Sequence, residues 1–345
     1  MAIDLKSLYI EEIEELILSL GIEKYRAKQI FEWVSKGADS FDEMTNISKK
    51  HRELLADACY ISYAEASEVF RSKLDGTVKI LCRFKDGEHA ECVALPYEHG
   101  ISACISTQAG CKMGCSFCAS TKAGFSRNLV PGEMLSQIHI LNKELRKTNP
   151  NLTINHIVLM GIGEPLDNYE NTLKFLRLVN DSKGLNIGMR NISLSTCGLV
   201  DKIERLSKEN LQLTLSVSLH APTNDIRSKL MPVNNKYCVE ELIEACKKYI
   251  AVTGRRISFE YSLISGVNDS KYCAEKLAEL LSGMLCHVNL IPVNTIKERS
   301  FTPSEKRNIF AFSSVLEKAK INVTVRRTMG ADINAACGQL RAKKL

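Results

Sequence analysis

From residue 101 to residue 326 the chain alternates between short extended apolar runs and longer segments whose apolar residues recur with helical spacing. This alternation constrains the fold more than any other feature. We expect strands at residues 101–107, 155–160, 191–196, 212–218, 256–263, 286–291 and 321–326. We expect helices at residues 131–147, 168–180, 201–208, 239–252, 270–282 and 303–319. Six β/α units favour an α/β fold in which a parallel sheet curls into a partial (β/α)6 barrel.

The first 60 residues follow a purely helical pattern. Apolar residues recur with helical spacing over 7–20, 24–36 and 48–58, and Gly21 and Gly37 stand where the first two helices should end. These residues form either an accessory nucleic-acid-binding module or a domain that covers the core.

Residues 61–100 contain two extended runs, 78–84 and 90–96, and Asp86-Gly87 marks the turn between them. We expect an antiparallel hairpin there. The sequence therefore predicts three parts: an N-terminal helical accessory domain at 1–60, a β-hairpin connector at 61–100, and a barrel with a C-terminal tail at 101–345.

Composition narrows the class of protein. No run of 18 apolar residues exists, so we expect no transmembrane helix, and the acidic N-terminus lacks the pattern of a signal peptide. The 13 cysteines are an odd number and most are scattered singly, which suits a reducing compartment and not a disulfide scaffold. We therefore expect a cytoplasmic, monomeric protein that does not bind membranes.

The net charge of +6 is distributed unevenly. Residues 1–60 hold 8 Lys and Arg against 12 Asp and Glu, a balance of −4, which leaves +10 for the remainder. A basic excess in the barrel is consistent with a polyanionic substrate, and equally with an ordinary solvated surface.

Three cysteines, Cys111, Cys115 and Cys118, follow the first barrel strand with the spacing C-x3-C-x2-C. Each could bind a different iron of one [4Fe–4S] cluster, and the fourth iron would stay open for a small molecule, whereas clusters used only for electron transfer usually have four cysteines. A zinc-stabilised RNA-binding protein without catalysis is the alternative. Zinc normally recruits a fourth nearby Cys or His, and none stands out beside Cys118.

Other polar residues also follow barrel strands, at the end where β/α barrels hold their active sites. They are Gly163, Glu164, Ser195, Ser218, His220 and Asn294. The glycine would let a ligand approach the backbone, and the carboxylate could accept from an amine. Each residue alone has a structural explanation, such as a tight turn or a buried histidine, but their common location favours a binding site.

Together these residues resemble the RlmN/Cfr family, the radical S-adenosylmethionine (SAM) methyltransferases of adenosine in 23S ribosomal RNA. The resemblance covers about residues 20–341 and rests on segments at 106–111, 127–129, 160–166, 194–196, 218–222, 234–237, 266–269, 289–292 and 335–340. The cysteine loop is generic to radical SAM enzymes. The tail Ala335-Ala-Cys-Gly-Gln-Leu340 is specific to this family.

The resemblance implies a radical SAM barrel with two cofactors, one [4Fe–4S] cluster and SAM. It assigns the cluster to Cys111, Cys115 and Cys118. It assigns SAM to Gly163, Glu164, Ser195, Ser218, Leu219, His220 and Asn294.

The resemblance also implies the reaction. Cys337 first takes a methyl group from one SAM. A 5′-deoxyadenosyl radical from a second SAM then removes hydrogen from that methyl, and the resulting carbon radical adds to adenine C2. Loss of the C2 proton to Glu91 and attack of Cys104 on Cys337 release 2-methyladenosine and leave a transient Cys104–Cys337 disulfide.

Several positions depart from the family pattern. Ala90-Glu91-Cys92 replaces an aliphatic residue followed by Glu-Thr, Asn334 replaces Asp in the tail, and Thr295 replaces Pro. Pro165 favours the branch that methylates C2, and the Cfr branch, which methylates C8 of the same adenosine, is the alternative. The implied partners are 23S rRNA, in some members tRNA, an external electron donor and a disulfide reductant.

Overall fold

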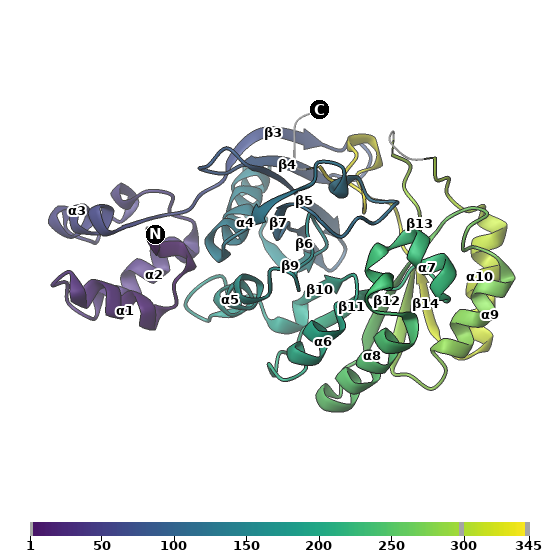
Figure 1. Ribbon diagram of the computed structural model, residues 1–345. Coiled ribbons are helices and arrows are strands. Elements are labelled where there is room, and N and C mark those ends of the chain that lie inside the picture. Colours follow the sequence, from purple (N-terminus) through teal and green to yellow (C-terminus); the bar gives the residue numbers. More distant parts are fainter. Residues whose placement is uncertain (1–2, 297–299, 342–345) are drawn as a thin grey trace.

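A computed structural model describes residues 3–296 and 300–341 (Figure 1). Seven strands of its main sheet run parallel in the order β14-β13-β12-β11-β10-β9-β6. Their bounds are β6 Gly100–Cys104, β9 Ile154–Leu159, β10 Ile192–Thr196, β11 Thr214–Ser218, β12 Ile257–Leu263, β13 Cys286–Pro292 and β14 Asn322–Val325. The seven expected strands and the partial-barrel fold class are confirmed, although β6 ends at Cys104 and not at residue 107.

Helices cover the outside of the curled sheet (Figure 1). They are α4 Pro131–Arg146, α5 Tyr169–Asn180, α6 Val200–Leu206, α8 Val239–Thr253, α9 Lys271–Leu280 and α10 Lys306–Lys318. All six were expected from helical spacing. A seventh helix, α7 (Asn224–Leu230), was not expected, because only Arg227 and Leu230 of its 7 residues are buried and the sequence shows no apolar period there.

Along the barrel strands, side chains that pack in the core alternate with side chains that face the barrel interior. In β10, Ile192, Leu194 and Thr196 are buried, whereas Ser193 and Ser195 between them are only half-buried. β13 repeats the pattern, with buried Val288 and Leu290 alternating with more exposed residues. Successive strand residues point to opposite faces, so the apolar set packs beneath the helices and the polar set faces the interior.

The N-terminal residues form the helices α1 (Ile10–Ser19), α2 (Arg26–Lys36) and α3 (Lys49–Ala58), drawn in purple beside the barrel (Figure 1). Gly37 ends α2 with φ 102°, a left-handed conformation that favours glycine. The Gly132 amide at the start of α4 donates to Ser7 Oγ at 2.8 Å, which joins these residues to the barrel.

The expected hairpin is part of a larger antiparallel extension of the main sheet. β3 (Glu65–Arg71), β4 (Val78–Arg83) and β5 (His89–Tyr97) pair in sequence, and β5 pairs antiparallel with β6. β3 was not expected, because it is a mostly exposed edge strand without an apolar face. No helix in the described ranges is long and apolar enough to cross a membrane.

Candidate active site

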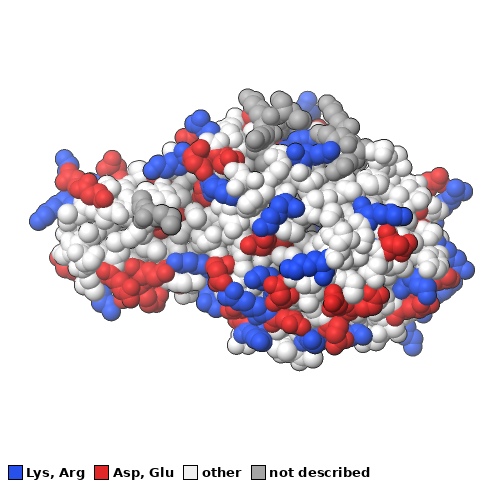
Figure 2. Space-filling view, viewed as in Figure 1, with Lys and Arg blue, Asp and Glu red and all other residues white. Residues whose placement is uncertain are grey.

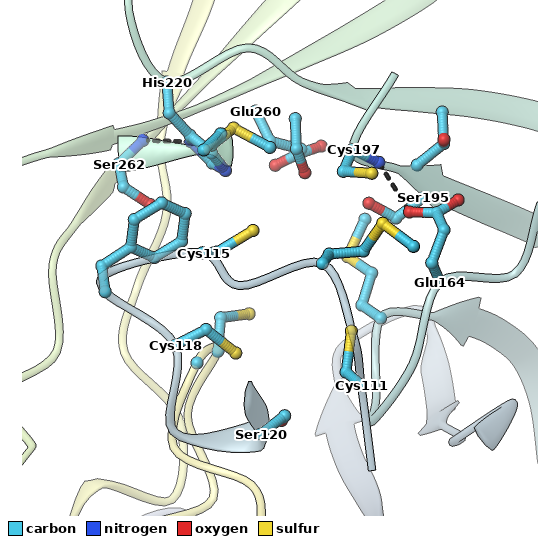
Figure 3. A pocket seen from close by; sticks show the side chains of 18 of the residues that line it. Cys111, Cys115, Cys118, Ser120, Glu164, Ser195, Cys197, His220, Glu260 and Ser262 are labelled. Carbon is cyan, nitrogen blue, oxygen red and sulfur yellow. Dashed lines mark hydrogen bonds between the residues drawn. The ribbon is translucent and has the colours of Figure 1, made fainter. Parts of the chain in front are cut away.

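The carboxyl ends of the barrel strands, the loop after β6 and the C-terminal tail surround one cavity of about 1000 Å³, its open mouth included (Figure 3). Its wall contains most of the residues expected in the site: Cys111, Cys115, Cys118, Gly163, Glu164, Ser195, Ser218, His220, Asn294 and Cys337. These residues come from six separate stretches of sequence, and the fold brings them together.

The loop of Cys111, Cys115 and Cys118 lies opposite the strand ends (Figure 3). Its backbone is fixed at both ends, because the Cys111 amide donates to Gly124 O at 2.9 Å and the Ser116 amide to Leu230 O at 2.8 Å. Burial raises the pKa of the Cys111 thiol to about 12, and it raises the pKa of Cys115 and Cys118 as well. Bonds to iron would compensate the thiolates for this loss of solvation.

The three sulfurs fit a cluster with one open iron. They share one cavity wall, and the Cys118 thiol lies near enough to those of Cys111 and Cys115 to raise the pKa of both. Among residues 3–296 and 300–341, no set of three or more Cys, His, Asp or Glu side chains is placed to hold a metal ion as it stands. Cavity space lies between the cysteine loop and Glu164, where SAM would meet an open iron.

Glu164 presents a buried carboxylate to this cavity. Its Oε2 accepts from the Cys197 amide at 2.7 Å, and its Oε1 from the Leu166 amide at 3.1 Å. Burial raises the pKa of Glu164 above its usual value, and these hydrogen bonds oppose that shift. Gly163 has φ 107°, and a Cβ there would lie 2.7 Å from Gln108 Cβ, so this turn requires glycine.

His220 is buried and neutral. Its Nδ1 accepts from the Ser262 amide at 2.9 Å, which leaves Nε2 as the protonated nitrogen. Burial, aided by the charge of Arg227, lowers the pKa of His220 to about 3. The ring therefore fixes the end of β12 and also offers an N–H group on the cavity wall.

Leu219 does not line the cavity. Its side chain is fully buried in the core, and its amide donates to Glu260 O while its carbonyl accepts from Arg227 Nε. Because β11 ends at Ser218 and the chain then turns, Leu219 points away from its two polar neighbours, Ser218 and His220.

A second cavity of about 570 Å³ adjoins the first. Cys104, from the end of β6, lies on its wall, and Cys337 and Arg326 lie on the walls of both cavities. Burial raises the pKa of the Cys104 thiol to about 12; the charge of Cys337 adds to the shift, and that of Arg326 opposes it. Cys337 itself is exposed. The two cysteines, 233 positions apart in the sequence, thus share one cavity.

The tail is anchored at Cys337 and at the two residues that follow it. Asn294 Nδ2 donates to Cys337 O at 3.1 Å, the Ala119 amide donates to Gly338 O at 2.8 Å, and Gln339 Nε2 donates to Thr295 O at 3.1 Å. The tail therefore rests directly on the loop of the three cysteines. Asn334 precedes this segment with φ 51°, a left-handed conformation that asparagine tolerates.

Glu91 lines neither cavity. It forms a buried ion pair with Lys79, with 2.9 Å between Nζ and Oε1, and its Oε2 accepts from the Arg341 amide at 2.8 Å. Lys79 also donates to Asn334 O at 3.2 Å. In this structure, the pair therefore holds both ends of the Cys337 tail.

We expect Glu91→Gln to lower the free energy of unfolding by about 3 kcal/mol, because it removes the charge of one partner from a buried ion pair. Thermal or denaturant unfolding of the full chain measures the change. Glu98→Gln, at an exposed position seven residues further along the sequence, is the control and should change stability little. Equal stability of the two variants would contradict the interpretation of Glu91 as an anchor.

Two charged residues of the site were not identified in the sequence. Glu260 and Arg326 line the main cavity, with 3.6 Å between Arg326 Nη1 and Glu260 Oε2. Glu260 Oε2 is buried without a hydrogen-bond partner. The sequence does contain a signal for Glu260, because it is a charged residue between two apolar ones in the strand segment Phe259-Glu-Tyr261, at a position that faces the barrel interior.

Known proteins match this chain over nearly its whole length. A family model described as the radical SAM superfamily matches residues 105–277, and one described as a ribosomal RNA large subunit methyltransferase N-terminal domain matches residues 3–61. A crystal structure of a radical SAM methyltransferase from Sphaerobacter thermophilus is 43% identical, with a TM-score of 0.95, and the match covers 99% of this chain and 100% of that one.

Two curated relatives carry the name probable dual-specificity RNA methyltransferase RlmN. The protein of Alkaliphilus oremlandii is 52% identical over 99% of this chain and 98% of its own length. That of Clostridium acetobutylicum is 53% identical over 96% of this chain and 94% of its own length.

The fold and the site thus define a radical SAM enzyme, with a [4Fe–4S] cluster and SAM as its cofactors. Within that class, the chain belongs to the RlmN family of methyltransferases. Family membership favours the enzyme over the alternative of a zinc-stabilised protein without catalysis.

Proposed function

We propose that this protein methylates C2 of an adenosine in 23S rRNA, and the equivalent position of an adenosine in tRNA, by way of a methyl group carried on Cys337. The observation that carries the proposal is the position of Cys337 on the wall shared by two cavities. One cavity holds Cys111, Cys115, Cys118 and the residues proposed to bind SAM, and the other holds Cys104. The name of the relatives, dual-specificity RNA methyltransferase, supports two RNA substrates.

Adenine C2 has no lone pair that could attack the methyl group of SAM, so the carbon must be delivered as a radical. Cys111, Cys115 and Cys118 would hold the cluster, which would supply the electron for reductive cleavage of SAM to a 5′-deoxyadenosyl radical. Beforehand, the Cys337 thiol loses its proton and its sulfur attacks the methyl carbon of another SAM; the S–CH3 bond of that SAM breaks and S-adenosylhomocysteine leaves. The same residue then presents that carbon for hydrogen removal and for addition to C2.

Release of the product needs a second thiol. A Cys104 thiolate attacks Cys337 Sγ, the bond between Cys337 sulfur and the transferred carbon breaks, and the new methyl group takes up a proton. The Cys104–Cys337 disulfide must be reduced before another turnover. The shared cavity supports this step, because Cys104 and Cys337 both line its wall.

We assign removal of the C2 proton to Glu91; the unpaired electron that remains on the adduct would return to the cluster. Its carboxylate is held by Lys79 and the Arg341 amide, so it could reach an adenine only if the tail segment at Arg341 shifts. The Glu91→Gln variant also tests this role. Loss of the base should leave RNA attached to Cys337 even though Cys104 is present.

Basic residues at the mouth would hold the phosphates of the RNA. Arg327, on the wall of the second cavity, and Lys112, in the cysteine loop, are both exposed. Figure 2 shows mixed charge over the barrel on the face in view and a group of acidic residues over α1. On that face, the Lys and Arg residues do not form one continuous basic surface. We therefore place the RNA contact at the cavity mouth. Phosphate contacts there would offset the few kcal/mol needed to unstack one adenine.

Glu164 should control the affinity for SAM, since its carboxylate would accept hydrogen bonds from the amino group. We expect Glu164→Gln to weaken SAM binding at least about tenfold, the usual effect of losing a charged acceptor. Protonation of this carboxylate should weaken SAM binding. Because burial raises the pKa of Glu164, the parent protein should lose affinity for SAM at a higher pH, on acidification, than it would if Glu164 had the pKa of an ordinary carboxyl group.

Equilibrium dialysis of SAM against cluster-loaded protein, over a range of pH, measures both effects. Glu170→Gln, at an exposed position on α5, is the control. A Glu164→Gln variant with the affinity and pH dependence of the parent would contradict the assignment.

Mass mapping of modified adenosines tests the proposed function. A deletion strain rescued with this chain should regain 2-methyladenosine in 23S rRNA and in tRNA. Recovery of 8-methyladenosine would favour the alternative, which Pro165 argues against. Absence of any methylated adenosine would exclude the proposed function.

A further inference from the structure

A fully buried arginine lies behind the cysteine loop. Arg227 belongs to α7, which packs directly against this loop through the hydrogen bond from the Ser116 amide to Leu230 O. On the same helix, Leu230 forms a small apolar core with Met231, Cys197 and Val293, and Cys115 and Phe117 pack against that core.

The hydrogen-bond acceptors of Arg227 are all neutral. They are Cys197 O at 2.7 Å, Leu219 O and Asn234 Oδ1 at 3.1 Å, and Ser218 O at 3.2 Å. None of the described carboxylates forms an ion pair with it. Burial lowers the pKa of Arg227, but an arginine side chain keeps its proton in proteins. A full positive charge is thus buried without an anionic partner.

Such a charge is costly unless an anion compensates it. The ionisable groups that act on Arg227 are the thiols of Cys197, Cys115 and Cys246. Burial raises the pKa of Cys197 and Cys246 well beyond neutral pH, so both stay uncharged. Cys115 differs, because as a cluster ligand it would be a thiolate.

We propose that Arg227 is the buried counter-charge of the iron–sulfur cluster and raises its reduction potential. Three thiolates give an oxidised [4Fe–4S]²⁺ cluster a net charge of −1, and reduction makes this −2. A fixed positive charge behind Cys115 stabilises the reduced form more than the oxidised form. Net charge and burial are the main determinants of the potential of such clusters.

Arg227 also acts on Glu164 through one residue. Cys197 accepts from Arg227 with its carbonyl and donates to Glu164 with its amide, both at 2.7 Å. A purely structural role would therefore also reduce activity when Arg227 is replaced. The test must separate the charge from the hydrogen bonds, and activity alone cannot do so.

Arg227→Lys and Arg227→Gln are a matched pair, since both lose the forked hydrogen bonds but only lysine keeps the charge. The full chain is reconstituted anaerobically without SAM or RNA, and the reduced cluster is titrated by electron paramagnetic resonance. At a fixed applied potential, the ratio of reduced to oxidised cluster should be about tenfold lower in Arg227→Gln than in Arg227→Lys, a shift of about 59 mV for one electron. Equal potentials in the two variants would overturn the proposal.

Loss of the cluster from a variant is also informative. If Arg227→Gln binds no cluster, the proposal requires that Arg227→Lys still binds one. It also requires that the two variants, both without a cluster, are equally stable to heat, so that the loss of the cluster does not reflect a damaged fold. Failure of both variants to bind a cluster would overturn the proposal, because the hydrogen bonds and not the charge would then be essential. The inference rests on the proposed cluster ligands, and it stands whichever RNA is methylated.

Discussion

Cys104→Ala protein purified from cells should carry RNA attached covalently to Cys337. Without a thiol in the second cavity, the bond between Cys337 sulfur and the transferred carbon cannot be broken by disulfide formation. Multiple turnover should fall at least about 100-fold, while the first addition to RNA still occurs. Nuclease digestion followed by mass spectrometry of the peptide around Cys337 measures the attached nucleotide.

The matched control is Cys273→Ala, which removes another buried thiol, from α9, where it lines neither cavity. This variant should be isolated free of RNA and should methylate normally. Free Cys104→Ala protein together with normal levels of methylated rRNA would exclude Cys104 as the residue that resolves the intermediate.

Cys337→Ala should abolish methylation, by about 10⁴-fold or more, because no other residue on the shared wall can carry the methyl carbon between the two cavities. The variant should still bind iron, since the three cysteines proposed as ligands are intact. It should form no covalent RNA adduct, alone or combined with Cys104→Ala. Nucleoside mass spectrometry and iron analysis measure these properties.

A Cys337→Ala variant that still produced methyladenosine would show that the methyl group reaches RNA directly from SAM. Loss of iron from the same variant would instead assign Cys337 to the cluster. The anchoring of its tail on the cysteine loop, through the Ala119 amide and Gly338 O, makes the iron analysis a necessary control.

The sequence was sufficient to predict the barrel and most of the site. Strand ends in a β/α barrel meet at one face, so Glu164, Ser195, Ser218 and Asn294 could be placed together from alternation alone. The cysteine spacing predicted the cluster loop. Cys104 and Cys337 were paired only through the resemblance to a family, because no periodicity links two single cysteines in distant segments.

The parts of the site that the sequence did not predict depend on the direction of side chains and on strand pairing. Leu219 was grouped with Ser218 and His220, but the turn after β11 directs it into the core. Lys79 was not expected beside Glu91, and the pairing of β4 with β5 brings it to this carboxylate; the role of Glu91 as the base stays a prediction. Arg227 lies on a short helix without an apolar period, and its contacts involve carbonyl groups that a sequence pattern does not reveal.

The most direct test of the central claim, that the methyl carbon reaches RNA by way of Cys337, is an isotope experiment. Cluster-loaded enzyme is turned over several times with RNA and with SAM whose methyl group is fully deuterated. The account predicts a product methyl group with two deuterium atoms and one hydrogen from solvent, and one deuterium in 5′-deoxyadenosine. A product that retains all three deuterium atoms would contradict it.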